Sequence, residues 1–158
     1  APLPLLYRTA KFQTVGEYFV TLDSYPEDIR ILLARLSGLD LEKLPGSKEI
    51  TTVLTEELVS WANENGWYPE REYKAGIFRE HKSGKYEGRI DVYVNRDSLI
   101  PEKGLPPLAI EIDRGNKKWS IMKLEHLQGR GCSCLWIKWG KKIDIEIPDG
   151  IMTFHVPL

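Results

Sequence analysis

Residues 108–139 read LAIEIDRGNKKWSIMKLEHLQGRGCSCLWIKW, and this stretch decides the fold. In residues 108–113, apolar side chains alternate with small or acidic ones, as in a β-strand. Residues 117–129 then form a cationic segment with helical character, which Gly131 ends. Residues 132–139 are rich in aromatic and β-branched side chains and predict a buried strand. A strand, a helix and a strand in this order predict a mixed α/β fold.

The flanking residues add one more helix and further strands. Behind a cap at Ser47, residues 48–65 place apolar side chains on one helical face, at about 100° per residue. The pattern then changes to strands over 67–78 and 89–94, the latter reading RIDVYV. Residues 142–157 add one or two short edge strands. We therefore expect a single core domain over 48–158.

The first 47 residues are predicted to form a helical extension packed on this core. Residues 15–22 indicate a short helix. A second helix follows, because Ser24 and Glu27 have the spacing of a capping box and Gly38 is a suitable end.

Composition limits where the protein works. No apolar run approaches the roughly 20 residues that a membrane-spanning helix needs, so no membrane association is expected. Cys132 and Cys134 are the two cysteines, and partners two residues apart in a strand rarely form a disulfide. We interpret them as reduced core thiols, which favours a cytoplasmic location. The three histidines do not have the spacing of a zinc site.

Positive charge is concentrated in one part of an otherwise balanced chain. The formal net charge is -1, yet residues 114–142 carry eight Lys or Arg and one acid, Glu125. A cationic surface on a nearly neutral body is typical of nucleic-acid binding, and a solvated cationic face is the alternative. The residues that we expect to contact DNA lie in this stretch and in the turn before residue 90: Arg114, Lys117, Lys118, Arg89 and Lys85.

Three carboxylates are predicted to converge on the sheet. Glu111 and Asp113 share one face of the 108–113 strand, because side chains alternate across a strand. In the neighbouring run, Asp91 takes the face opposite to three apolar residues that we expect to lie together: Ile90, Val92 and Val94. If the two strands pair, the acids meet, and such a cluster favours Mg²⁺ or Mn²⁺. The alternative is a half-exposed sheet with a solvated acidic face.

The element order, with Asp91 and Glu111-Ile-Asp113, resembles the PD-(D/E)xK nuclease superfamily. The closest resemblance is to the group similar to the very-short-patch-repair endonuclease, whose third strand reads Glu-x-Asp. It covers about residues 48–140 and implies a restriction-endonuclease-like αβββαβ core, with a mixed central sheet flanked by helices. It also implies an Mg²⁺-dependent endonuclease that hydrolyses DNA phosphodiester bonds, with Asp91, Glu111 and Asp113 as metal-binding and catalytic residues.

Two helical residues have a counterpart in this group. Glu57 lies within the apolar face of the 48–65 helix, where a carboxylate is either paired with Lys or Arg or directed at a metal. The resemblance implies that it is an outer metal ligand. Lys123 stands four residues before Leu127, which stands four before Gly131, and this spacing matches the cationic residue of the second core helix. Lys123 is therefore expected to stabilise charge on the scissile phosphate.

The chain departs from the family pattern at two positions. Asp113 replaces the lysine expected two residues after Glu111, and the following residues, 114–118, lack the expected histidine. Lys117 or Lys118 could substitute for it. A catalytically degenerate nucleic-acid-binding module of the same fold is therefore the alternative function, and a plain interaction domain is a third. Homodimerisation and attachment to a larger protein both stay open.

Overall fold

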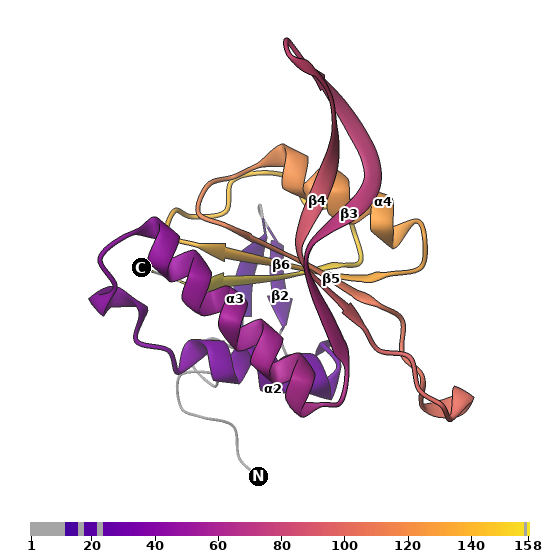
Figure 1. Ribbon diagram of the computed structural model, residues 1–158. Helices are drawn as coiled ribbons and strands as arrows, with labels where there is room; N and C mark the ends of the chain where they lie inside the picture. The colour runs from indigo at the N-terminus through magenta and orange to yellow at the C-terminus, as the bar shows by residue number, and fades with distance from the viewer. Residues whose placement is uncertain (1–11, 16–17, 22–23, 157) are drawn as a thin grey trace.

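The computed structural model describes residues 12–15, 18–21, 24–156 and 158. Figure 1 shows a central sheet with helices on both faces. The elements are β1 (Phe12–Val15), β2 (Tyr18–Thr21), α2 (Glu27–Ser37), η2 (Leu41–Lys43), α3 (Ser47–Glu64), β3 (Tyr68–His81), β4 (Gly84–Asn95), η3 (Pro101–Lys103), β5 (Leu108–Asp113), α4 (Lys118–Gln128), β6 (Ser133–Trp139) and β7 (Ile151–Val156). Among these residues, no helix is long and apolar enough to cross a membrane.

The main sheet is mixed, with β5 at its centre. Its five strands are ordered β3-β4-β5-β6-β7; β3, β4 and β5 pair antiparallel, whereas β5, β6 and β7 pair parallel. Helix α4 connects the parallel strands β5 and β6. All six residues of β5 are buried, as expected for a strand with neighbours on both sides and helices on both faces. The predicted mixed α/β class is confirmed.

Two apolar clusters hold the helices against the sheet. One lies between the sheet and helices α2 and α3 and includes Val92 and Val94. The other lies beneath α4 and includes Ile90. The prediction that these three residues share one face is therefore wrong. The reason is that β4 pairs with β5 only over 92–94, so Ile90 precedes the paired segment and lies where β4 has diverged from β5.

The N-terminal region is only partly helical. Helix α2 confirms the second predicted helix, but its N-cap is Pro26 rather than Ser24, so the capping box is wrong. Within 15–22, the described residues belong to β1 and β2, which pair antiparallel, where we predicted a helix. The sequence of β2, YFVT, is aromatic and β-branched, and such side chains favour strands. Residues 16, 17 and 22 of that predicted helix lie outside the described residues.

Strands β3 and β4 continue beyond the sheet as a long hairpin. They pair from Tyr68–Asn95 to His81–Gly84, with a register shift between Lys74 and Phe78. Figure 1 shows this part of the hairpin rising from the sheet as a two-stranded ribbon. We call residues 76–88 the hairpin arm.

Candidate functional site

A groove of about 1180 Å³ runs between the hairpin arm, the ends of β4 and β5, and the first turns of α3 and α4. Its lining combines both signs of charge. Seven Lys or Arg residues line it: Lys48, Arg79, Arg89, Arg114, Lys117, Lys118 and Lys123. Five acids line it: Glu72, Glu87, Asp91, Glu111 and Asp113. The three carboxylates predicted to converge therefore lie in one groove, next to predicted DNA-contacting residues.

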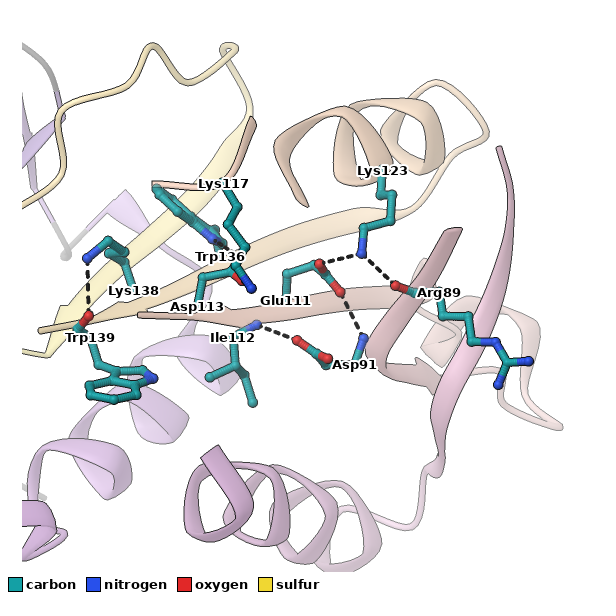
Figure 2. Close-up of polar contacts among 10 residues, drawn as sticks. All are labelled: Arg89, Asp91, Glu111, Ile112, Asp113, Lys117, Lys123, Trp136, Lys138 and Trp139. Atoms are coloured by element: carbon teal, nitrogen blue, oxygen red, sulfur yellow. Dashed lines mark hydrogen bonds and ion pairs between the residues drawn. The ribbon is translucent and has the colours of Figure 1, made fainter. Parts of the chain in front are cut away.

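Asp91 and Glu111 are linked at the point where β4 and β5 diverge. The backbone N–H of Asp91 donates to Glu111 Oε1 at 2.9 Å, and the backbone N–H of Ile112 donates to Asp91 Oδ2 at 2.8 Å. Figure 2 shows both carboxylates between the two strands. These side chains take the place of the ladder hydrogen bonds that the divergence removes, so the backbone itself fixes where the carboxylates lie.

Lys123 reaches this pair from α4. Its Nζ lies 2.9 Å from Glu111 Oε2 and donates to the carbonyl oxygen of Arg89 at 2.7 Å (Figure 2). Lys123 is 8% exposed and Glu111 is 2% exposed, so the ion pair is almost completely buried. The predicted meeting of Lys123 with the acidic face is confirmed by this contact.

Asp113 is held separately on the same side of the sheet. The indole Nε1 of Trp136 donates to Asp113 Oδ2 at 2.9 Å, and Lys117 Nζ lies 3.7 Å from Asp113 Oδ1. Trp136 is fully buried, so its ring fixes the Asp113 carboxylate.

Burial shifts the acid–base equilibria of the two linked carboxylates. Desolvation, strengthened by the charge of Asp91, raises the pKa of Glu111 to about 7. Desolvation also raises the pKa of Asp91 to about 6; the charges of Asp113 and Glu72 add to this rise, while the Ile112 N–H and Lys123 oppose it. Burial is therefore the main reason that ionising these two carboxyls is costly, and repulsion between neighbouring carboxylates adds to the cost.

The carboxylates do not form a ready-made ion cage. Among the described residues, no group of three or more His, Cys, Asp or Glu side chains is positioned to hold a metal ion. In this arrangement Asp91, Glu111 and Asp113 each direct at least one oxygen at an N–H or ammonium donor.

Glu57 lies away from this cluster, with Arg35 of α2. Arg35 Nε donates to Glu57 Oε2 at 2.6 Å, and the same guanidinium also contacts Glu64. This ion pair matches the first of the two interpretations of Glu57, the paired carboxylate. A different acid, Glu72 of β3, lines the groove instead. Its φ of 53° lies in the left-handed region, which a sequence pattern for strands does not reveal.

The predicted DNA-contacting residues divide into two groups. Arg89, Arg114, Lys117 and Lys118 line the groove. Lys85 lies on the arm with its Nζ 5.2 Å from the ring centroid of Phe78.

One basic residue of the cationic stretch is internal. Lys138 is 0% exposed, and its Nζ donates to the carbonyl oxygens of Trp139, at 3.1 Å, and Lys141. Burial lowers the pKa of Lys138. The expectation that all eight basic residues contribute to one surface is wrong at this position, because β6 is buried on both of its faces.

Neither Arg79 nor Trp119 is among the residues that the sequence predicts to contact DNA. In the structure the Arg79 guanidinium stacks on the Trp119 ring at 4.8 Å from its centroid, and both line the groove. They come from β3 and α4, so a long-range contact creates this part of the wall. The comparisons with known proteins found no matching family model, curated protein or solved structure.

Proposed function

We propose that the protein hydrolyses DNA phosphodiester bonds with Mg²⁺ or Mn²⁺, as an endonuclease or nuclease domain of the PD-(D/E)xK type with a restriction-endonuclease-like core. One observation carries the proposal: Asp91, Glu111 and Lys123 form a buried, hydrogen-bonded group in a groove lined by further Lys and Arg side chains. A phosphate drawn in by these cations would meet that group. The free thiols of Cys132 and Cys134 support a cytoplasmic setting.

The donor set suits a hard divalent cation. Carboxylate oxygens are the ligands that Mg²⁺ and Mn²⁺ prefer. Burial is the main cause of the raised pKa values of Asp91 and Glu111, and repulsion from neighbouring carboxylates adds to it. A bound cation would offset both effects. Asp91 and Glu111 would hold the ion, and Asp113 would orient the ion or its water. When bound, the ion supplies a Lewis acid that polarises a phosphoryl oxygen and lowers the pKa of water.

The chain's own side chains would supply orientation and charge. Lys123 Nζ, fixed by the Arg89 carbonyl oxygen, would donate to a phosphate oxygen as negative charge develops there. Arg114, Lys117 and Lys118 would hold phosphates along the strand and thereby fix its register. Burial of the Glu111–Lys123 pair keeps bulk water from screening these charges.

Cleavage of supercoiled plasmid and of labelled oligonucleotides with Mg²⁺ or Mn²⁺ tests the proposal. We expect nicked or linear product from the wild type and a loss of about 100-fold or more in Asp91→Asn and Glu111→Gln. The matched control is Glu102→Gln, an exposed acid in η3, which should cleave at the wild-type rate. Wild-type cleavage by Asp91→Asn would overturn the proposal.

A catalytically degenerate DNA-binding module is the second candidate function. The Glu111–Lys123 ion pair favours it, because Lys123 already neutralises the carboxylate that the metal would need. Binding assays in EDTA, run beside the cleavage assays, separate the two functions. Salt-sensitive DNA binding with no cleavage under any divalent cation would establish the module and exclude the nuclease.

A further inference from the structure

We propose that the groove-facing side of the hairpin arm binds unpaired bases, so that the substrate is DNA with a single-stranded segment. This inference rests on the proposed function for the reaction, but binding itself requires no hydrolysis. It concerns the upper part of the groove, beyond the carboxylates.

The register of the arm separates its two faces. Arg79 pairs with Tyr86, and His81 pairs with Gly84, so Arg79, His81 and Tyr86 point to one side. All three line the groove. The alternating positions Phe78 and Lys85 point to the opposite side, where Lys85 stacks on Phe78. The arm thus carries an aromatic and basic face towards the groove, and its opposite face carries Phe78, Lys85 and the acid Glu80.

The groove-facing side forms a series of ring contacts. The Arg79 guanidinium covers Trp119 at 4.8 Å, and the rings of His81 and Tyr86 meet edge to face with centroids 5.4 Å apart. The Tyr86 hydroxyl is 2.7 Å from Ser83 Oγ.

Packing within the protein does not account for this aromatic face. Tyr86 is 48% exposed, and within the described part of the chain the arm pairs with no third strand, since β5 contacts β4 only over 92–94. Two-stranded ribbons are marginally stable on their own. Half-exposed rings that point into a cationic groove are instead typical of surfaces on which nucleobases stack.

Stacking of this kind selects for single strands. In a duplex the faces of the bases are covered by their neighbours, whereas an unpaired base presents its face to aromatic side chains. From Tyr86 to Asp91, strand β4 spans about 17 Å at roughly 3.4 Å per residue. A single strand lying along the arm would therefore reach the carboxylates within a few nucleotides.

Fluorescence anisotropy in EDTA tests the inference without requiring cleavage. The probes are a labelled single-stranded oligonucleotide, the same sequence as a blunt duplex, and a strand of equal length with abasic sites, which keeps the phosphates but lacks bases. The test variants are Tyr86→Ala and His81→Ala. Tyr86→Phe retains the ring, and Phe78→Ala removes an aromatic ring of similar exposure from the opposite face.

We expect the wild type to bind the single strand more tightly than either the duplex or the abasic strand. Tyr86→Ala and His81→Ala should each weaken single-strand binding by about tenfold. Tyr86→Phe and Phe78→Ala should bind as the wild type does, and this result shows that loss in the alanine variants is not caused by misfolding of the arm. Equal binding of normal and abasic strands, or equal loss in Phe78→Ala, would overturn the inference.

These outcomes are independent of the reaction. A protein that prefers single strands through Tyr86 but cleaves no DNA would refute the nuclease proposal and leave this inference intact. A protein that cleaves DNA while Tyr86→Ala and His81→Ala bind normally would refute only the inference.

Discussion

Gly88 of β4 leaves open the space through which the Lys123 side chain passes. A Cβ atom at Gly88 would lie 2.9 Å from Lys123 Cδ and 2.9 Å from Trp119 Cζ2. Both distances are shorter than side-chain carbons tolerate, so the missing side chain lets Lys123 reach Glu111 and the Arg89 carbonyl oxygen. Gly88, which has no side chain, thereby determines where the Lys123 ammonium lies in the groove.

Replacing Gly88 with Ala should displace Lys123 and lower activity. We expect Gly88→Ala to reduce the proposed cleavage by about tenfold or more and to destabilise the fold by about 1–3 kcal/mol through overpacking. Gly115→Ala is the matched control, because a Cβ there meets no atom within 4 Å. Cleavage rates and thermal melts of both variants check the prediction. Unchanged activity in Gly88→Ala would show that the position of Lys123 is unimportant.

The metal-free protein should become less stable as pH rises towards neutrality. Folding raises the pKa of Asp91 to about 6 and of Glu111 to about 7, above the unfolded values of roughly 3.9 and 4.3. Between about pH 4 and pH 7 the folded state therefore binds more protons, and the free energy of unfolding falls as pH increases.

Thermal melts in EDTA from about pH 5 to about pH 8 measure this dependence. The fall should be smaller in Asp91→Asn, because one of the two titrating carboxyls is absent. Stability that rises over the same interval would contradict the assignment.

Metal binding should depend on Asp91 and not on Glu57. Isothermal titration with Mn²⁺ should show binding to the wild type and at least about tenfold weaker binding to Asp91→Asn. Glu57→Gln should retain wild-type affinity and lose about 1 kcal/mol or less of stability, since its partly exposed ion pair with Arg35 is weakened. If Glu57→Gln loses Mn²⁺ as completely as Asp91→Asn, then Glu57 is a ligand, as the family resemblance implies.

Glu72 should lower the stability of the fold and strengthen metal binding. Its left-handed backbone conformation suits glycine, so Glu72→Gly should stabilise the fold by up to about 1 kcal/mol. The same change removes a negative charge that acts on Asp91 and should weaken Mn²⁺ binding by a few-fold. Glu72→Gln retains the strain and removes the charge, so it should weaken Mn²⁺ binding without stabilising the protein. Melting temperatures and titrations of the two variants check both effects.

Local patterns predicted most of the core elements. Apolar spacing located α3, and the cationic segment that Gly131 ends located α4. Alternation located β5, and aromatic and β-branched content located β6. These signals come from residues that are close together in the sequence. Alternation also placed Glu111 and Asp113 on the side of the sheet that faces α4. The described residues of segment 15–22 were predicted incorrectly, since the aromatic and β-branched sequence of β2 favours a strand, which pairs with β1.

Long-range geometry could not be read from the sequence. The divergence of β4 from β5 places Ile90 and Val92 in different apolar clusters. No residue pattern in the sequence predicts this divergence. The wall formed by Arg79 and Trp119 depends on how far the hairpin arm extends past the sheet. Glu57 was ambiguous because the position of Arg35 was unknown.

Trp136 determines which charge position 113 can carry. Its indole N–H points at the Asp113 carboxylate from a fully enclosed site, so an ammonium group introduced there would face another donor with no water to separate them. A lysine at this position, as in the commoner Glu-x-Lys pattern, would require the tryptophan to change as well. Asp113 and Trp136 would therefore have to be replaced together. The aspartate of the Glu-x-Asp sequence in β5 thus depends on the tryptophan of the neighbouring strand β6.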